Sequence, residues 1–359
     1  MRLSRLLTAT TATALVALTV LTGCSRAEES GSAPAASASP AAELRLGYFP
    51  NITHAPALIG VDKGLFAQEL GSTKLTTQTF NAGPEEVNAL LGGSLDAGFI
   101  GSSPAINAFA KSNGEAVRLI AGSTSAGAQL VTSPDITSPQ QLKGKTIATP
   151  QLGNTQDVAL KKWLGEQKLE IGQGPDKVTV QNIDNPRTLD LFKKGEVAGG
   201  WLPEPWSSRL VDAGAKVLVD EKSLWPDGKF PTTVLIVRTQ YLQEHPDTVA
   251  ALLRGEQKAI DFANSRRDEA KTVANGAIKK LTNSALAPAV LDRAFSELQF
   301  DNDPLAATFP QLAKDSVTAG ASKTEANLQG FIDVTALNTV READGKPAVD
   351  AAGLDKKQG

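Results

Sequence analysis

Short apolar runs that end in turn residues recur along the chain, and each is followed by apolar positions at helical spacing. The clearest case is residues 143–164, where the β-branched run Thr146–Thr149 predicts a buried strand. Residues 157–164 then have helical spacing, and Asn154 or Thr155 can cap that helix. A strand that feeds a helix start presents free backbone N–H groups and a positive dipole end, which favours an anion site. An ordinary strand-to-helix turn has the same pattern.

The same pattern occurs three more times in the first third of the chain. Each strand ends in small or hydroxyl residues, and a proline lies at or near the first helical turn, where its missing N–H costs little. Four such loops at the same end of a sheet would line one cleft with backbone donors and hydroxyls. None of the four contains Lys or Arg, which suits a small anion held by dipoles and hydrogen bonds. The three further strands are expected at residues 44–48, 76–80 and 97–100.

Strand and helix signals alternate through the middle of the chain, which predicts an α/β fold with two lobes. Residues 61–70 have helical spacing, and Gly64-Leu65-Phe66 is expected to mark the end of this helix. The strand at 129–132 crosses into the second lobe, the strand at 232–238 returns to the first, and the pattern after Pro246 is helical. We therefore expect a hinged clamshell. Its expected parts are lobe 1 at 44–127 plus 236–345, lobe 2 at 128–235 and a C-terminal tail at 346–359.

The N-terminus has the pattern of a secretory signal. Arg2 and Arg5 precede an apolar run over 6–20 that is too short to span a bilayer. The following Leu-Thr-Gly-Cys24 resembles the lipobox of bacterial lipoproteins, in which the cysteine is lipidated. We expect a lipoprotein signal peptide at 1–23, lipidation at Cys24, and a flexible tether at 24–43, rich in Ser, Ala, Pro and Glu. A secreted protein cleaved near Cys24 is the alternative.

Composition argues against several other classes of protein. A net charge of −3 without a long basic stripe argues against a nucleic-acid partner. One cysteine and two histidines offer no metal cluster, and we expect neither a cofactor nor a catalytic residue. Lys143-Gly-Lys-Thr146 resembles a phosphate-binding loop, but it precedes a strand instead of following one. No later apolar run could cross a bilayer, so membrane attachment depends on Cys24.

Several motifs follow one another along the chain, namely Phe49-Pro-Asn-Ile-Thr-His-Ala-Pro-Ala57, Phe80-Asn-Ala-Gly-Pro-Glu-Glu86, Gly101-Ser-Ser-Pro-Ala105, Thr149-Pro-Gln-Leu-Gly-Asn-Thr-Gln-Asp157, Trp201-Leu-Pro-Glu-Pro-Trp206 and Leu224-Trp-Pro-Asp-Gly-Lys229. In this order they resemble the substrate-binding proteins of nitrate/sulfonate/taurine-type ABC importers, closest to the aliphatic sulfonate branch. The resemblance covers roughly residues 44–340 and implies a type II periplasmic-binding-protein fold, with a ligand cleft between two hinged lobes.

The resemblance implies a monomeric receptor that captures a small organosulfonate anion. It would be exported, lipid-anchored at the outer face of the cell membrane, and would deliver its ligand to a permease with a separate ATPase. By motif, the ligand-binding residues would be Asn51, His54, Gly83, Ser102 and Ser103 in the first lobe and Gln151, Asn154, Thr155 and Gln156 in the second.

The ligand within this family stays open. Sulfonate binders with a Lys-Gly-Ser-Ser loop differ from this chain, whose residues 151–155 read Gln-Leu-Gly-Asn-Thr and carry no cation. Nitrate, bicarbonate and taurine are therefore alternatives. Glu204 is a candidate because a carboxylate can pair with the ammonium of taurine, and it otherwise points away from an anion because of Coulomb repulsion. His54 is a hydrogen-bonding group or a structural imidazole, and Trp206 packs in the core or walls an alkyl chain.

Two other functions compete with the receptor hypothesis. A pyrimidine-precursor enzyme of the same fold would need reactive histidine and cysteine positions that this chain does not offer, so we do not expect an enzyme. A surface lipoprotein that binds no solute would leave four cleft loops without a purpose.

Overall fold

The computed structural model describes residues 40–355. The expected signal peptide, Cys24 and most of the expected tether lie outside the described residues, as do residues 356–359. Among residues 40–355, no helix has the length and apolar character needed to cross a membrane.

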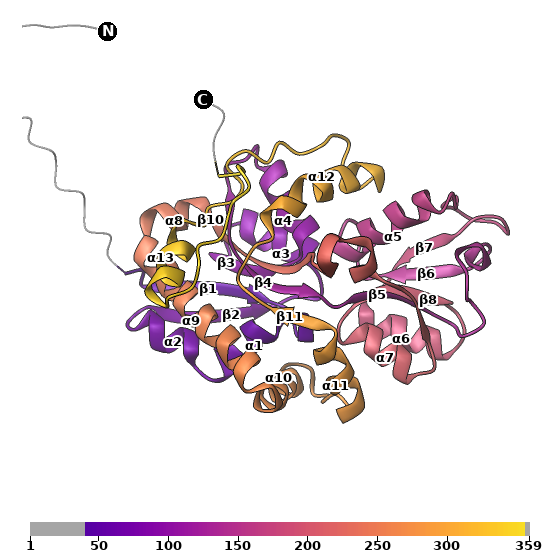
Figure 1. The fold of residues 1–359 in the computed structure, drawn as a ribbon, viewed down its shortest axis with the longest axis horizontal. Helices are drawn as coiled ribbons and strands as arrows, with labels where there is room; N and C mark the ends of the chain where they lie inside the picture. The colour runs from indigo at the N-terminus through magenta and orange to yellow at the C-terminus, as the bar shows by residue number, and fades with distance from the viewer. Residues whose placement is uncertain (1–39, 356–359) are drawn as a thin grey trace, which may run out of the picture. The chain divides into compact units, whose positions relative to one another are not determined.

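The first sheet has six strands in the order β11-β4-β10-β3-β1-β2. The strands β1, β2 and β3 are parallel, whereas β10 runs antiparallel to both β3 and β4. Every residue of β4 is buried, because helices cover both faces of this sheet (Figure 1). The strands are β1 (Glu43–Tyr48), β2 (Lys74–Thr79), β3 (Ala97–Ile100), β4 (Val117–Ala126), β10 (Pro231–Arg238) and β11 (Leu298–Phe300).

The second sheet has five strands in the order β7-β6-β8-β5-β9. The strands β6, β7 and β8 are parallel, and β5 runs antiparallel to β8 and β9. The helix α5 (Thr155–Glu166) lies on one face of this sheet, and α6 (Asn185–Lys193) and α7 (Trp206–Asp212) lie on the other (Figure 1). The edge-to-face pair Trp163 and Trp201 lies in its core. The strands are β5 (Ala128–Thr132), β6 (Thr146–Thr149), β7 (Thr179–Asn182), β8 (Gly199–Pro203) and β9 (Lys216–Asp220).

Thirteen α-helices in the described part of the chain cover the sheets (Figure 1). The helices α1, α2, α9 and α10 pack together below the first sheet, α3 and α4 lie above it, and α5, α6 and α7 belong to the second sheet. They are α1 (Ala55–Asp62), α2 (Leu65–Leu70), α3 (Gly83–Leu91), α4 (Ser102–Lys111), α5 (Thr155–Glu166), α6 (Asn185–Lys193), α7 (Trp206–Asp212), α8 (Thr239–Glu244), α9 (Pro246–Ser265), α10 (Arg267–Thr282), α11 (Pro288–Ser296), α12 (Phe309–Thr318) and α13 (Thr335–Ala343).

The chain passes between the sheets twice. The first passage is the β4–β5 junction, where Ala126 and Gly127 both have positive φ angles. The second lies between β9 and β10. Because β10 pairs with β3 and β4, residues 231–235 belong with the first sheet, although we expected them in lobe 2. The described part of the expected tail packs on the first lobe, where Ala351 and Leu354 are buried.

Two local expectations were wrong. The helix expected at 61–70 is two helices, because Gly64 adopts a left-handed conformation (φ 70°) between Asp62 and Leu65. That glycine directly follows Lys63, the C-cap of the first helix, and is the N-cap of the second, so the expected helix end near Gly64 is confirmed. The four strand-to-helix loops also do not share one sheet, since β1, β2 and β3 belong to the first sheet and β6 to the second.

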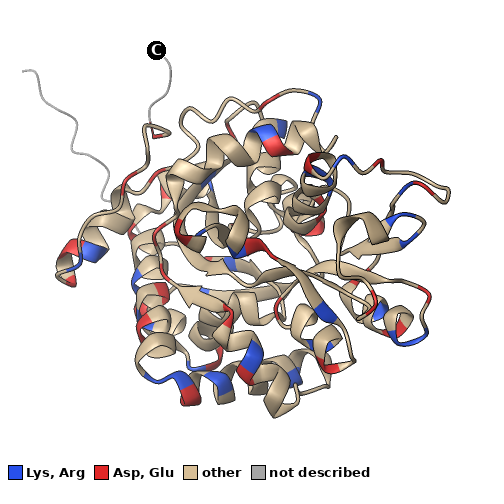
Figure 2. Ribbon diagram, turned by 45° about the vertical axis from the view of Figure 1, so that its right-hand side comes forward, with Lys and Arg blue, Asp and Glu red and all other residues tan. Residues whose placement is uncertain are grey.

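Acidic and basic side chains are interspersed over the outer helices (Figure 2). Glu69 of α2, for example, pairs with Arg254 and Lys258 of α9. Such exposed pairs contribute about 0–1 kcal/mol each, so the stability of the fold depends mainly on its buried core.

Candidate ligand-binding site

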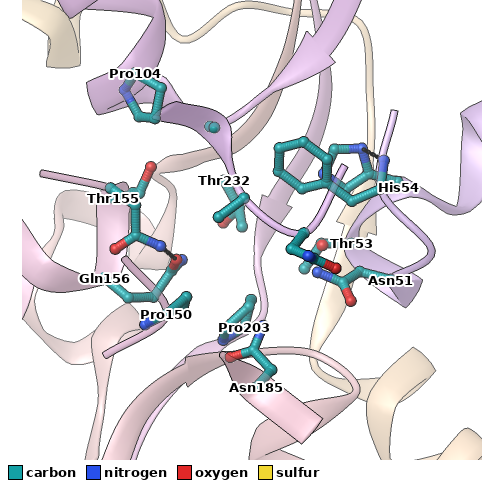
Figure 3. A pocket seen from close by; sticks show the side chains of 16 residues that line it. Asn51, Thr53, His54, Pro104, Pro150, Thr155, Gln156, Asn185, Pro203 and Thr232 are labelled. Atoms are coloured by element: carbon teal, nitrogen blue, oxygen red, sulfur yellow. Dashed lines mark hydrogen bonds between the residues drawn. The ribbon is translucent and has the colours of Figure 1, made fainter. Parts of the chain in front are cut away.

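A narrow cavity of about 30 Å³ lies between the lobes. All of its lining except Thr232 comes from the carboxyl ends of the six parallel strands, β1, β2 and β3 on one side and β6, β7 and β8 on the other. In α/β sheets this is the edge at which ligands bind. Figure 3 shows Thr155 and Gln156 of the second lobe across from Asn51, Thr53 and His54 of the first. The other lining residues are Phe49, Asn81, Ala82, Gly83, Gly101, Pro104, Pro150, Asn154, Asn185, Pro203 and Thr232.

Four helices begin at this cavity. The helix α3 starts at Gly83, α4 follows Gly101, α5 starts at Thr155 and α6 starts at Asn185, so their first turns present N–H groups without an intrahelical partner to the space between the lobes. The Asn154 side chain caps α5 by accepting a hydrogen bond of 2.9 Å from the Asp157 N–H, which confirms one of the two expected caps. The dipoles of these helices favour a negatively charged ligand.

Three side chains in the lining have their acceptor atom occupied by a donor from the protein. The Oδ1 of Asn51 accepts a hydrogen bond of 2.9 Å from the Trp206 indole, and the Oε1 of Gln156 accepts one of 3.0 Å from the Asn154 amide. The Nδ1 of His54 accepts one of 3.3 Å from the Phe49 N–H. A neutral imidazole whose Nδ1 accepts carries its proton on Nε2. All three groups therefore keep N–H donors that a ligand can use.

The lining is also free of formal charge. It contains no Asp, Glu, Lys or Arg, and burial lowers the pKa of His54 from 6.5 to about 3. The His54 imidazole is therefore neutral at physiological pH. A site with neutral donors and helix N-termini can hold an anion without any counter-charge from a side chain.

The low pKa of His54 predicts a specific pH dependence of stability. Between pH 6.5 and 3 the unfolded chain binds a proton at this position and the folded chain does not, so stability falls as the pH drops. From pH 7 to 5, we expect the free energy of unfolding to fall by about 2 kcal/mol more in the wild type than in His54→Gln. Urea unfolding at both pH values measures this difference. Parallel decreases in the two proteins would contradict it.

Two lining atoms from the second lobe are buried without a hydrogen-bond partner, the Oγ1 of Thr155 and the Oδ1 of Asn185. Buried polar atoms are normally paired, so unpaired atoms at a cavity indicate a place for a ligand or water. Thr155 also closely approaches the first lobe. A Cβ atom added to Gly101 would lie 2.4 Å from its Oγ1, so closure at this point needs glycine.

The structure brings six of the ten residues expected at the site into the lining, namely Asn51, His54, Gly83, Asn154, Thr155 and Gln156. Ser102 and Ser103 start α4 beside it, and their buried hydroxyls have no partner and do not line the cavity. Gln151 donates a hydrogen bond of 2.7 Å to Glu85, which joins the second lobe to the first at an exposed position.

Glu204 is fully buried outside the lining. Its carboxylate accepts hydrogen bonds from the Ser207 hydroxyl at 2.7 Å and the Ser208 N–H at 3.3 Å, and it pairs with Arg293 of α11 at 3.0 Å. Burial raises the pKa of Glu204, while these donors act in the opposite direction. The carboxylate thus joins the second lobe to a helix that packs on the first.

Sequence reasoning missed several lining residues, of which Asn185 is the most informative. It follows β7 and precedes Pro186, so it has the strand, turn and early proline that marked the other loops. The same rule applied to residues 178–186 would have found it. Thr232 has no such signal, because it reaches the cavity from the start of an antiparallel strand.

Two α/β lobes with a donor-lined cleft between them define a periplasmic-binding-protein fold. The alkanesulfonate-binding protein SsuA from Xanthomonas axonopodis pv. citri, solved with bound MOPS, superposes with a TM-score of 0.64. It covers 79% of this chain and 93% of its own at 21% identity, which supports the fold alone.

A model of the NMT1-like family matches residues 37–278, and the chain belongs to that family. The taurine-binding periplasmic protein of Escherichia coli (strain K12) is 30% identical over 209 residues, which span 57% of this chain and 61% of that relative. A putative aliphatic sulfonates-binding protein of Bacillus subtilis (strain 168) is 28% identical over 251 residues, which span 64% of this chain and 67% of that relative.

Proposed function

We propose that this protein is the extracytoplasmic solute-binding component of an ABC importer, anchored through Cys24, and that it captures a small organosulfonate anion between its lobes. The observation that carries this proposal is the uncharged lining with side-chain N–H donors and helix N-termini at the carboxyl ends of six parallel strands. The relatives named for taurine and aliphatic sulfonates support it. The partners would be a permease and a separate ATPase.

A sulfonate matches this lining because its three oxygens only accept hydrogen bonds. Hydrogen bonds to a charged group contribute about 1.5–3 kcal/mol each, and micromolar affinity needs about 8 kcal/mol. Several donors from both lobes must therefore act together, so binding favours the closed state. Since residues of both lobes line the cavity, the ligand must enter while the lobes are further apart.

The small cavity favours a second candidate, a compact oxyanion such as nitrate or bicarbonate. Taurine is less well matched, since no acidic side chain in the lining faces its ammonium and Glu204 is paired with Arg293. The unpaired Oδ1 of Asn185 is the acceptor that an ammonium or a hydroxyl would use.

A thermal-shift screen of the purified protein against ethanesulfonate, nitrate, bicarbonate and taurine tests the proposal. A ligand that binds only the folded state stabilises it by about 2.7 kcal/mol at 100 times its Kd, which raises the melting temperature by several degrees. A rise with ethanesulfonate supports the sulfonate function, and a rise with nitrate or bicarbonate alone supports the second candidate. No rise with any of the four rejects the proposal.

The variant Gly101→Ala tests whether the ligand binds between the lobes. Its new Cβ would collide with Thr155 across the cleft, so we expect ligand affinity to fall at least about tenfold. Gly165→Ala is the control, because nothing lies within 4 Å of the added atom. An equal change of ligand affinity in Gly101→Ala and Gly165→Ala would mean that the ligand binds elsewhere.

A further inference from the structure

We infer that Trp206 is a positioning residue that sets ligand selectivity by orienting the amide of Asn51. This inference rests on the proposed function and adds a determinant to the same site. Trp206 is the first residue of α7 in the second lobe, and Asn51 follows β1 in the first, so the hydrogen bond between them joins the two lobes.

The orientation of the Asn51 amide follows from what an indole can do. The Trp206 Nε1 only donates, and it lies 2.9 Å from Asn51, so the atom facing it must be the amide oxygen. The Nδ2 of Asn51 then has no partner among the described residues, and Asn51 lines the cavity. Without the indole, either the oxygen or the nitrogen of the Asn51 amide could face the ligand.

Other contacts hold this arrangement in place. Trp206 and Asn51 are 9% and 5% exposed, so water does not compete freely for their hydrogen bond. The Arg209 guanidinium lies 4.7 Å from the indole ring centroid. Beside the pair, the Thr53 N–H donates a backbone hydrogen bond of 3.3 Å to the Glu204 carbonyl, which also crosses between the lobes. The Asn51 side chain does not cap the following helical turn, so it is available to the ligand.

The consequence is a preference for ligands that only accept. When the Asn51 oxygen faces the indole, the amide N–H faces the ligand. It can donate a hydrogen bond to an oxygen of the ligand but cannot accept one from an O–H or N–H. Ethanesulfonate and nitrate have only acceptors and satisfy the Asn51 N–H in any orientation, whereas bicarbonate and taurine satisfy it only when the hydroxyl or the ammonium points away from Asn51. Trp206 therefore contributes to selectivity without touching the ligand, and it acts through Asn51.

A double-mutant cycle with ethanesulfonate as the probe tests this role. Trp206→Phe keeps a ring and removes the N–H, and we expect affinity for ethanesulfonate to fall about tenfold, because the Asn51 oxygen is left unpaired. Affinity for bicarbonate and taurine should fall less. In an Asn51→Ala background, Trp206→Phe should change the affinity less than twofold. A tenfold loss in that background would mean that Trp206 acts by packing and would overturn the inference.

Hydrogen exchange of the indole N–H in the protein without ligand separates this inference from the proposed function. We expect slow exchange of the Trp206 indole proton in the wild type and faster exchange in Asn51→Ala. Equal rates overturn the inference whatever the ligand is. Slow exchange in a protein that binds none of the four solutes upholds the Asn51 orientation and rejects the proposed function.

Discussion

Replacing Gln156 by Glu is expected to weaken binding of ethanesulfonate by at least about 100-fold. The variant keeps the size of the side chain and its hydrogen bond from Asn154, but a carboxylate replaces the Nε2 donor. The loss of a hydrogen bond to a charged group costs about 1.5–3 kcal/mol, and repulsion between two negative charges adds to it. Isothermal titration calorimetry at pH 7 measures the effect.

Two comparisons make this result specific to the site. Gln140→Glu adds the same charge outside the lining and should leave affinity within twofold. Lowering the pH should restore part of the affinity of Gln156→Glu, because a protonated carboxyl group regains a donor. Unchanged affinity in Gln156→Glu at pH 7 would show that this amide does not contact the ligand.

Replacing Arg293 by Met is expected to give the largest loss of stability. It leaves the carboxylate of Glu204 fully buried without its ion-pair partner, while the carbon chain of the side chain is largely kept. Breaking a buried ion pair from one side costs about 3–5 kcal/mol, and we expect the lower end because the Arg293 side chain is 23% exposed. Urea unfolding at pH 7 measures the change.

Adding Glu204→Gln to Arg293→Met removes the unpaired charge and should restore most of the lost stability. The pH dependence gives a second check. Burial raises the pKa of Glu204, and removal of Arg293 raises it further, so the folded variant binds a proton that the unfolded chain releases. The deficit of Arg293→Met should therefore shrink as the pH falls toward 5. A constant deficit, or no rescue by the second substitution, would assign the loss to packing.

The sequence predicted the parts of this site that depend on local structure. Hydrophobic spacing located the strands before each loop, and turn residues with early prolines located the helix starts, so Gly83, Asn154 and Thr155 were expected where they lie. Local signals are short in range, and each of these residues is positioned by the strand and helix on either side of it.

The parts that could not be predicted depend on partners far away in the chain. From the sequence, Glu204 was a candidate partner for the ammonium of a ligand. Its carboxylate instead pairs with Arg293, which lies on a helix whose neighbours in the fold the sequence did not predict. The donor face of Asn51 depends on Trp206, 155 positions later. The charge state of His54 depends on its burial, which lowers its pKa. The spacing of residues along the chain does not indicate that a side chain is buried between two lobes.

The order of the strands along the chain has a consequence for how the molecule assembles. The second sheet uses one continuous stretch, whereas the first sheet lacks β10, the strand that joins β3 to β4, until the chain has returned. In the second sheet Gln129 of β5 pairs with Asp220 of β9, so the points where the chain enters and leaves this lobe are held side by side. Once the second lobe has folded, β4 and β10 no longer have to meet across a long flexible loop, and the entropic cost of their pairing is reduced. Folding of the lobe encoded in the middle of the chain would therefore lower the entropic cost of completing the first sheet.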